Sequence, residues 1–347
     1  MHRQRVSLRD VGKAAGFSHV TVSFALRNHP SVPPKTAERI KAVAAQLGYK
    51  PDPMLRALAE YRRSRRPARY QGSLAWINNY PHPEQLEDNY EYALYHQGAA
   101  KRAGELGYQV VSLTPTVQKM SGEKLRRVLT NRGIQGLLLP PQPASHAVFD
   151  FDFTGFSAVA FGFTLASPQL HVIANCQYRS SMIAVRALRE LGHRRIGFLI
   201  SQHLNERSEG TFLGGFLSEQ NAFPLKDRLP VRVWEKHPGA EERKDLLGWA
   251  RRNRPDAIIT DNVHWVREVL REIAIHVPED LSLAALTAGP KTTGYAGIDQ
   301  NDLEIGSRAV DALVGMIYRN ETGVPENPCR ILVESTWRTG ATVLSRA

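Results

Sequence analysis

Apolar residues in the first fifty positions recur at the spacing of short helices. A first helix begins at Ser7, where Asp10 completes a capping box, and it ends at Gly16. Its apolar positions are Leu8, Val11, Ala14 and Ala15. Ser18 caps a second helix that extends to about Arg27, so only two residues connect the helices. This spacing predicts a helix-turn-helix.

The second helix has two apolar faces. At 100° per residue its core side consists of Val22, Ala25 and Leu26. The opposite side consists of Val20, Phe24 and Arg27, with His19 and Ser23 beside them. Val20 and Phe24 stand where a solvated helix usually carries charge, which indicates that another molecule covers this surface.

A third helix completes the head of the chain. Pro33 and Pro34 pre-set its entry, and Gly48 ends it. The positions expected to face inward are Ile40, Val43, Ala44 and Leu47. Three helices of this size enclose one small core.

Beyond residue 70, short apolar runs alternate with longer helical patterns. The runs expected to be buried strands are 73–78, 108–113, 136–140, 157–163, 195–201, 256–260 and 281–286. Helices are expected over 92–106, 181–191 and 263–274. This alternation predicts parallel sheets with right-handed crossovers, in which ligands bind at the carboxyl ends of the strands.

Positive charge is concentrated at the start of the chain. The sequence has 45 Lys and Arg against 34 Asp and Glu. Residues 1–70 hold 15 of the bases and four of the acids, a net charge of +11, while the other 277 residues hold 30 of each sign. A basic module that also carries a helix-turn-helix is typical of binding to the phosphate backbone of nucleic acids. A solvated basic face that only confers solubility is the alternative.

Composition and motifs narrow the class of protein. Cys176 and Cys329 are too few for a disulfide framework, and the sequence has no metal-ligand spacing, phosphate loop or nucleophile elbow. His203 and Glu206 have no third ligand nearby, and His193 fits a helix end better than a catalytic base. We therefore expect no cofactor, no metal and no enzyme activity. Without a signal peptide or a long apolar span, a cytoplasmic location is expected.

Two groups of segments carry a family resemblance. VSLRDVGKAAGFSHVTVSFALRN, followed about twenty residues on by LGYKP, resembles the DNA-binding domain of the LacI/GalR family of bacterial transcription regulators. The runs that are similar to the family's effector domain are ALRELGHRRIGFL, VPEDLSLAAL, AGIDQNDLEIG and ILVESTWRTGATV. The resemblance thus covers nearly the whole chain.

The resemblance implies an architecture and a function. An all-α helix-turn-helix head, residues 1–50, would precede a hinge helix and basic linker, residues 51–70. Residues 71–347 would form an α/β effector-binding and dimerisation domain with two Rossmann-like lobes of the periplasmic-binding-protein type, crossed by three chain segments. Such a protein would be a repressor that binds a pseudo-palindromic operator as a homodimer and responds to a small molecule such as a carbohydrate. A cytosolic solute-binding protein or an enzyme on the same fold is the alternative.

The matching positions imply a DNA-binding surface. It consists of Ser7, Ser18, His19, Val20, Thr21, Ser23, Phe24, Arg27 and Leu58. We expect His19, Ser23 and Arg27 to make polar contacts with the DNA. Val20 and Phe24 would contact thymine methyl groups. Phe24 packing against the third helix instead is the alternative.

The hinge matches the family less closely. Leu58 would wedge between base pairs in the minor groove, and Leu55 stands where the family usually has a small residue. Packing of Leu58 on its own head domain is the alternative. A basic run follows, which either tracks phosphates or forms a solvated linker: Arg62, Arg63, Arg65, Arg66 and Arg69.

The sensor departs from relatives that bind sugars. Phe212 stands where they commonly have an arginine, Thr287 and Asn175 stand in place of aspartates, and Asn262 is followed by Val263 rather than by aspartate. Arg207, five residues before Phe212, is expected to replace the missing arginine. Each candidate could equally be structural. The expected effector pocket consists of Asn79, Tyr80, Phe163, Asn175, Arg207, Phe212, Asn262, Trp265 and Thr287.

Overall fold

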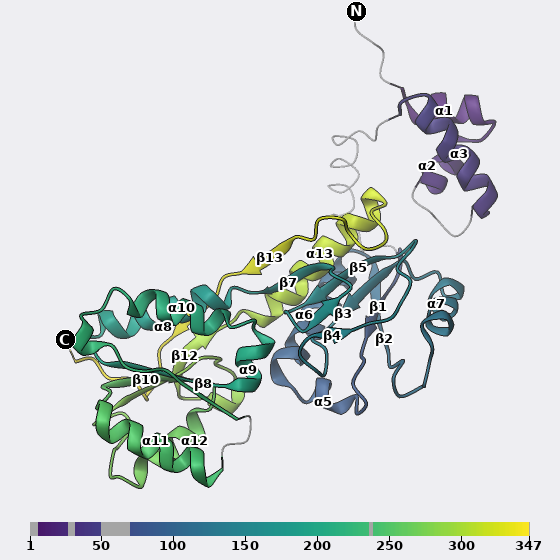
Figure 1. The fold of residues 1–347 in the computed structure, drawn as a ribbon. Helices are drawn as coiled ribbons and strands as arrows, with labels where there is room; N and C mark the ends of the chain where they lie inside the picture. Colours follow the sequence, from purple (N-terminus) through teal and green to yellow (C-terminus); the bar gives the residue numbers. More distant parts are fainter. Residues whose placement is uncertain (1–5, 27–31, 50–69, 236–238, 347) are drawn as a thin grey trace, which may run out of the picture.

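The computed structural model describes residues 6–26, 32–49, 70–235 and 239–346. The expected hinge, with Leu55, Leu58 and the arginine run, lies outside these ranges, as does Arg27. The described residues form a helical head and two α/β lobes (Figure 1).

The head contains the three expected helices. They are α1 (Leu8–Ala15), α2 (His19–Leu26) and α3 (Pro34–Gln46). Their shared core consists of Val11, Ala15, Val22, Ala25, Val32, Ala37, Ile40 and Ala44. The expectation that Leu47 faces inward is wrong: α3 ends at Gln46, and the side chain of Leu47, at its C-cap, is exposed.

The first lobe is built on a parallel sheet of six strands in the order β13-β7-β5-β3-β1-β2. Its strands are β1 (Gly72–Ile77), β2 (Tyr108–Leu113), β3 (Gly136–Leu139), β5 (Ser157–Phe161), β7 (His171–Asn175) and β13 (Arg330–Val333). Its helices are α5 (Glu84–Glu87), α6 (Tyr90–Glu105), α7 (Gly122–Asn131) and α13 (Asp302–Arg319). A small separate pair joins β4 (Ala147–Val148) and β6 (Leu165–Ser167).

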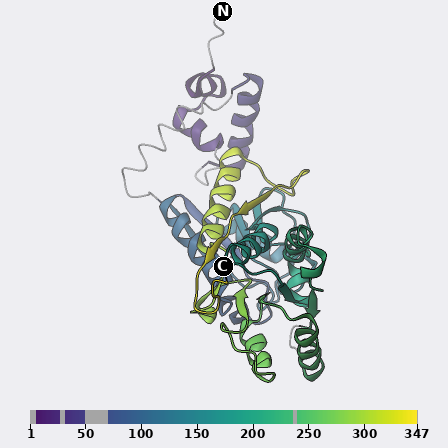
Figure 2. The ribbon, with the colours of Figure 1, turned by 90° about the vertical axis from the view of Figure 1, so that its left-hand side faces the viewer.

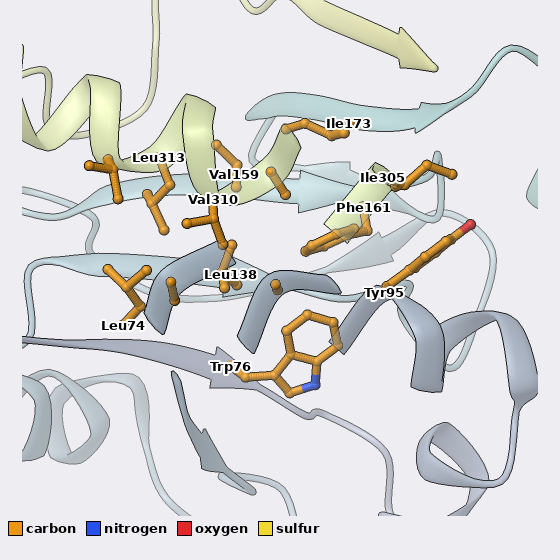
Figure 3. Packing of buried hydrophobic residues seen from close by; sticks show 14 of the residues in the cluster. Leu74, Trp76, Tyr95, Leu138, Val159, Phe161, Ile173, Ile305, Val310 and Leu313 are labelled. Carbon is orange, nitrogen blue, oxygen red and sulfur yellow. The ribbon is translucent and has the colours of Figure 1, made fainter. Parts of the chain in front are cut away.

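Alternate residues of β1 pack on opposite faces of this sheet. Leu74 and Trp76 pack in the cluster beneath α6 and α13 (Figure 3). Ala75 and Ile77 pack in a second cluster, which contains Leu125 of α7. Because both faces are covered, the strand is buried on both sides, as a near-continuous apolar run predicts.

The second lobe has a six-stranded sheet in the order β14-β12-β11-β10-β8-β9, parallel except for β14. Its strands are β8 (Ile196–Ser201), β9 (Arg232–Trp234), β10 (Ala257–Thr260), β11 (Ser282–Ala285), β12 (Ala296–Asp299) and β14 (Thr336–Arg338). Its helices are α8 (Gln177–Glu190), α9 (Gln202–Arg207), α10 (Thr211–Gln220), α11 (Ala240–Asn253), α12 (Val263–Arg271) and the short η1 (Leu225–Asp227) and η2 (Pro290–Thr292).

The chain passes between the lobes three times, as expected. It leaves β7 for α8, returns from β12 to α13, and leaves again from β13 to β14. The first lobe, begun by β1 to β7, is therefore completed by α13 and β13 from near the end of the sequence (Figure 2). No helix within the described ranges is long and apolar enough to cross a lipid bilayer.

Candidate functional site

The first candidate surface is the outer face of α2, and its position depends on two caps. The side chain of Ser7 accepts a hydrogen bond from the amide of Asp10, whose carboxylate accepts one from the Ser7 amide at 2.8 Å. Hydrogen bonds from Ser7 lower the pKa of Asp10. Ser18 in turn accepts from the amide of Thr21 at 3.1 Å. Both caps agree with the sequence prediction.

Glycines allow α1 and α2 to meet closely. Gly16 ends α1 with a φ of 75°, in the left-handed region. A Cβ on Gly12 would lie 2.7 Å from the carbonyl oxygen of Phe17, within the turn. The tight turn therefore needs a glycine at each of these positions, which fixes the angle at which α2 leaves α1.

The outer face of α2 is only partly as expected. Ser18, His19 and Val20 are exposed, Val20 to 47%. Phe24 is half-buried and packs against the core of the head. The exposed residues stay available to a partner molecule, whereas Phe24 contributes to the packing of the head as well as to its surface.

The second candidate surface lies between the lobes and centres on Arg207, the last residue of α9. Its guanidinium donates to the carbonyl oxygen of Gln142 and to the hydroxyl of Tyr92, both at 2.9 Å. Arg207 is 8% exposed. Both acceptors belong to the first lobe, in the loop after β3 and on α6. Arg207 thus joins the two lobes.

The side chains around Gln142 form one network at the carboxyl ends of β1 and β3. Asn79 donates to the side-chain oxygen of Gln142 at 2.8 Å, and the hydroxyl of Tyr80 donates to its carbonyl oxygen at 3.3 Å. Burial raises the pKa of the phenols of Tyr80 and Tyr92, to about 12 for Tyr92, while nearby Arg207 opposes the shift. The two phenols are therefore neutral hydrogen-bonding groups at physiological pH.

A second contact between the lobes involves Thr287, after β11. Burial raises the pKa of Glu91, on α6 of the first lobe, and the nearby side chain of Thr287 opposes that shift. Asp261, after β10, has its pKa raised by burial as well, although its carboxyl accepts hydrogen bonds from the amide and hydroxyl of Ser201. The carboxyl of Glu91, on the first lobe, is therefore near enough to Arg207 and to Asp261 to feel both charges.

The structure brings together four of the predicted pocket residues: Asn79, Tyr80, Arg207 and, through Glu91, Thr287. Phe163 lies under the guanidinium of Arg330, 4.8 Å from it. Asn175, at the first crossover, is buried and its side-chain nitrogen has no hydrogen-bond partner in the described structure. Both stay candidates.

Three other predicted pocket residues have structural roles. Phe212 is 1% exposed and packs in the core of the second lobe with Phe198 and Phe216, so its assignment to the pocket is wrong. Its helix turns the ring toward the sheet. Trp265 stacks edge-on against Trp234 at 5.1 Å. Asn262 caps α12 by accepting from the amide of Trp265.

Sequence reasoning missed Gln142, Tyr92 and Glu91. Gln142 follows the run 136–140 within a proline-rich loop, so only its position after a predicted strand pointed to the pocket. Tyr92 and Glu91 lie on the first turn of α6, a helix whose apolar spacing indicated packing alone. A polar residue that faces the opposite lobe leaves no local signal in the sequence.

His193 has the structural role that the sequence predicted. Its Nε2 lies 3.0 Å from the carbonyl oxygen of Leu344, and its Nδ1 lies 3.6 Å from the carboxylate of Asp256. Within the described ranges no three His, Cys, Asp or Glu side chains are grouped as metal ligands. Two surface hollows of about 210 and 430 Å³ lie on the second lobe, and neither is lined by Arg207 or its acceptors.

Comparison with known proteins gives matches in both parts of the chain. Residues 7–52 match the sequence model described as bacterial regulatory proteins, lacI family. Residues 185–343 match the model described as a periplasmic binding protein-like domain. Over 339 residues the chain is 25% identical to the HTH-type transcriptional repressor PurR of Haemophilus influenzae, a match that covers 92% of this chain and 94% of that protein.

Solved structures share the fold. A complex of the transcriptional regulator CelR with cellobiose is 20% identical, with a TM-score of 0.56 over 97% of this chain and all of that one. A lac repressor dimer bound to operator and the anti-inducer ONPF is 18% identical, with a TM-score of 0.55 over 98% of this chain and all of that one. The similarity thus includes both the head and the lobes.

Proposed function

The chain belongs to the lacI family of bacterial regulatory proteins, and from that premise we propose how this transcriptional repressor recognises DNA and what controls it. It binds a pseudo-palindromic operator as a homodimer, with α2 in the major groove. A small molecule between the lobes changes its affinity for that operator. Because its relatives are transcription regulators, an enzyme or a cytosolic solute-binding protein on the same fold is set aside.

The exposed face of α2 carries the proposal. His19 and Val20 are exposed on a helix that Ser18 caps. Val20 is apolar but lies outside the core of the head, so its exposure leaves a methyl surface for a partner molecule. Residues 1–70 have a net charge of +11, which suits a phosphate backbone. His19 supplies a hydrogen-bonding group and Val20 a methyl surface for thymine. Ser7, Thr21, Ser23, Phe24, Arg27 and Leu58 complete the proposed DNA-binding set.

The proposed effector site is the junction around Arg207, with Asn79, Tyr80, Thr287, Asn175 and Phe163 from the sequence prediction. A guanidinium, two phenols and several amides are suited to a small polar molecule, and a carbohydrate is one such class. The cellobiose in the CelR complex supports that class by analogy of fold. Because Phe212 and Thr287 replace two sugar-binding anchors of relatives, other small polar molecules belong in the ligand panel beside carbohydrates.

The DNA proposal is tested by selecting duplexes from a random pool with the full-length protein. We expect a pseudo-palindromic site, with an affinity that falls steeply between 50 and 200 mM salt, by about 10³-fold or more if six or more phosphates are contacted. Replacing His19 by Ala should change the base preference. The control Lys13→Ala, an exposed charge on α1, should weaken binding to all duplexes alike. Selection that returns no site contradicts the proposal.

The effector proposal is tested by thermal unfolding of the full-length protein with a panel of metabolites, because a ligand that binds the folded state raises its melting temperature. A true effector should also shift operator affinity. If every ligand that raises the melting temperature left operator affinity unchanged, the effector proposal would be wrong, while the DNA proposal would be unaffected.

A further inference from the structure

The turn between α9 and α10, residues 207–210, contacts the first lobe at two points although it belongs to the second. We infer that this turn, called here the interlobe latch, holds the two lobes closed without any small molecule, so that an effector acts by breaking or replacing the contacts of the latch. The inference concerns lobe closure itself and does not depend on the operator or on the identity of the effector.

The first contact of the latch is Arg207. Its guanidinium reaches the carbonyl oxygen of Gln142 and the hydroxyl of Tyr92, and a longer bond of 3.4 Å reaches the carbonyl oxygen of Pro143. In the described part of the chain no carboxylate forms an ion pair with this buried charge. A buried guanidinium without acceptors is costly, and its acceptors here lie on the opposite lobe. When the lobes separate, water has to replace these acceptors, so Arg207 makes its direct hydrogen bonds only in the closed form.

The second contact of the latch is Glu209. Its carboxylate accepts from the guanidinium of Arg330, on β13 of the first lobe, at 3.1 Å. Arg330 also lies over the ring of Phe163, 4.8 Å from its centroid. Glu209 and Arg330 are both exposed, so this pair adds less than Arg207 does. This pair joins the turn to β13, whereas Arg207 joins it to α6 and to the loop after β3.

Contacts outside the latch also bring the lobes together. A Cβ on Gly289, after β11, would lie 2.9 Å from the ring of Tyr90 on α6. Glu91, the next residue of α6, lies near the side chain of Thr287, which lowers its pKa against the effect of burial. The lobes therefore also meet where the segment after β11 faces the first turn of α6. A ligand that needs the donors of Arg207 must compete with Gln142 and Tyr92 for them. Its apparent affinity therefore falls as the fraction of molecules with a closed latch rises.

The test measures the distance between the lobes in the full-length protein without added ligand. Spin labels are placed at Thr154→Cys in the first lobe and Glu241→Cys in the second, both exposed, with Cys329→Ser to remove the exposed native thiol and Cys176 left in place because it is buried. The protein is refolded from denaturant before labelling so that no copurified molecule remains. Pulsed dipolar spectroscopy then gives the distance distribution.

We expect one short-distance population in the parent protein, with the open form below about one molecule in ten. Arg207→Met keeps the apolar stem and should raise the open form to about a third or more. The double variant Tyr92→Phe, Glu209→Gln removes the Arg207–Tyr92 bond and weakens the Glu209–Arg330 pair without leaving a cavity. If Arg207→Met does not fold, this double variant is measured instead and should also raise the open form. The matched control is Glu219→Gln, which breaks an ion pair with Arg186 inside the second lobe. It should leave the distribution unchanged.

Two results would overturn the inference. One is a parent protein that is mainly open without ligand. The other is a folded latch variant, shown to be folded by circular dichroism, whose distance distribution matches that of the parent. Neither result bears on operator binding, which the duplex selection tests separately.

Discussion

Asp302, a buried acid at the start of α13, lies near Glu91, a partly buried acid at the start of α6, and the two helices pack against each other. Burial, together with the nearby carboxyls of Glu91 and Asp299, raises the pKa of Asp302 to about 8. One oxygen of Asp302, Oδ1, has no hydrogen-bond partner in the described structure. The folded state therefore keeps a proton on Asp302 at a pH at which the unfolded chain has lost it.

Because Asp302 keeps its proton in the folded state, we expect the free energy of unfolding to fall as pH rises toward 8. Between the unfolded pKa of Asp302, about 4, and the folded value of about 8, the folded state binds the extra proton. The free energy of unfolding should thus decrease by up to about 1.4 kcal/mol per pH unit in this window. Asp302→Asn, which resembles the protonated acid, should flatten the slope. Urea unfolding at pH 5, 6, 7 and 8 measures it.

An exposed acid provides the control for the pH experiment. Glu326→Gln, in the loop before β13, removes a carboxyl that the fold leaves in solvent. It should leave the slope as in the parent protein. A parent protein that gains stability from pH 5 to pH 8, or an Asp302→Asn variant with the same slope as the parent, would contradict the assignment of the buried proton.

The close approach of α6 and α13 gives a second prediction. A Cβ on Gly98 would overlap the carbonyl oxygen of Leu303, whereas a Cβ on Gly104, on the same helix, meets nothing within 4 Å. Gly98→Ala should therefore destabilise the first lobe by about 1 to 3 kcal/mol through overpacking. Gly104→Ala should be neutral or stabilise it by up to about 1 kcal/mol through helix propensity. Thermal unfolding compares the two variants, and equal melting temperatures would argue against this helix contact.

The fold was largely predictable because its strands are buried on both faces. Runs such as 136–140 and 256–260 are apolar without alternation, and each appears as a central strand. The helix expected over 181–191 begins earlier, at Gln177, because its first turn is polar and carries no apolar signal. Edge strands such as β9 and β13 are short and partly exposed, so they lack the long buried apolar run by which the central strands were predicted.

The candidate effector site was less predictable than the fold. Asn79 and Tyr80 were chosen because they follow a predicted strand, and strand ends converge at one edge of a parallel sheet. In the structure both donate hydrogen bonds to Gln142, which follows the neighbouring strand β3. Phe212 was assigned by alignment to an arginine of relatives, but a phenylalanine in that place turns into the core. The partners of Arg207 come from 65 and 115 residues away in the sequence, and local patterns cannot reveal such pairs.

The cap of α1 gives a third prediction. Ser7→Ala removes the acceptor for the Asp10 amide and should cost about 1 kcal/mol of helix stability. Faster hydrogen exchange should appear in α1, along with weaker binding to every duplex, because α1 supports α2. Ser121→Ala removes the matching cap of α7, in the first lobe, where the side chain accepts from Lys124. That variant should loosen α7 and leave exchange in the head unchanged.

The last prediction separates recognition from packing on α2. Val20 is exposed and Phe24 is half-buried against the core of the head, although both stand on the face that was expected to meet DNA. Val20→Ser should therefore keep the stability of the head and lose the preference for thymine at one position, at a cost of about 1 kcal/mol for the preferred operator.

Phe24→Ala should instead destabilise the head, by less than the 3 to 5 kcal/mol or so that a fully buried ring costs, because the ring is only partly enclosed. Its loss of DNA binding should extend to all sequences, since an unfolded head binds none of them specifically. Duplex selection combined with hydrogen exchange of α1 to α3 distinguishes the two effects. If Phe24→Ala left exchange unchanged and altered only the base preference, Phe24 would be a reader of bases, as the sequence pattern first indicated, and its contact with the core would be incidental.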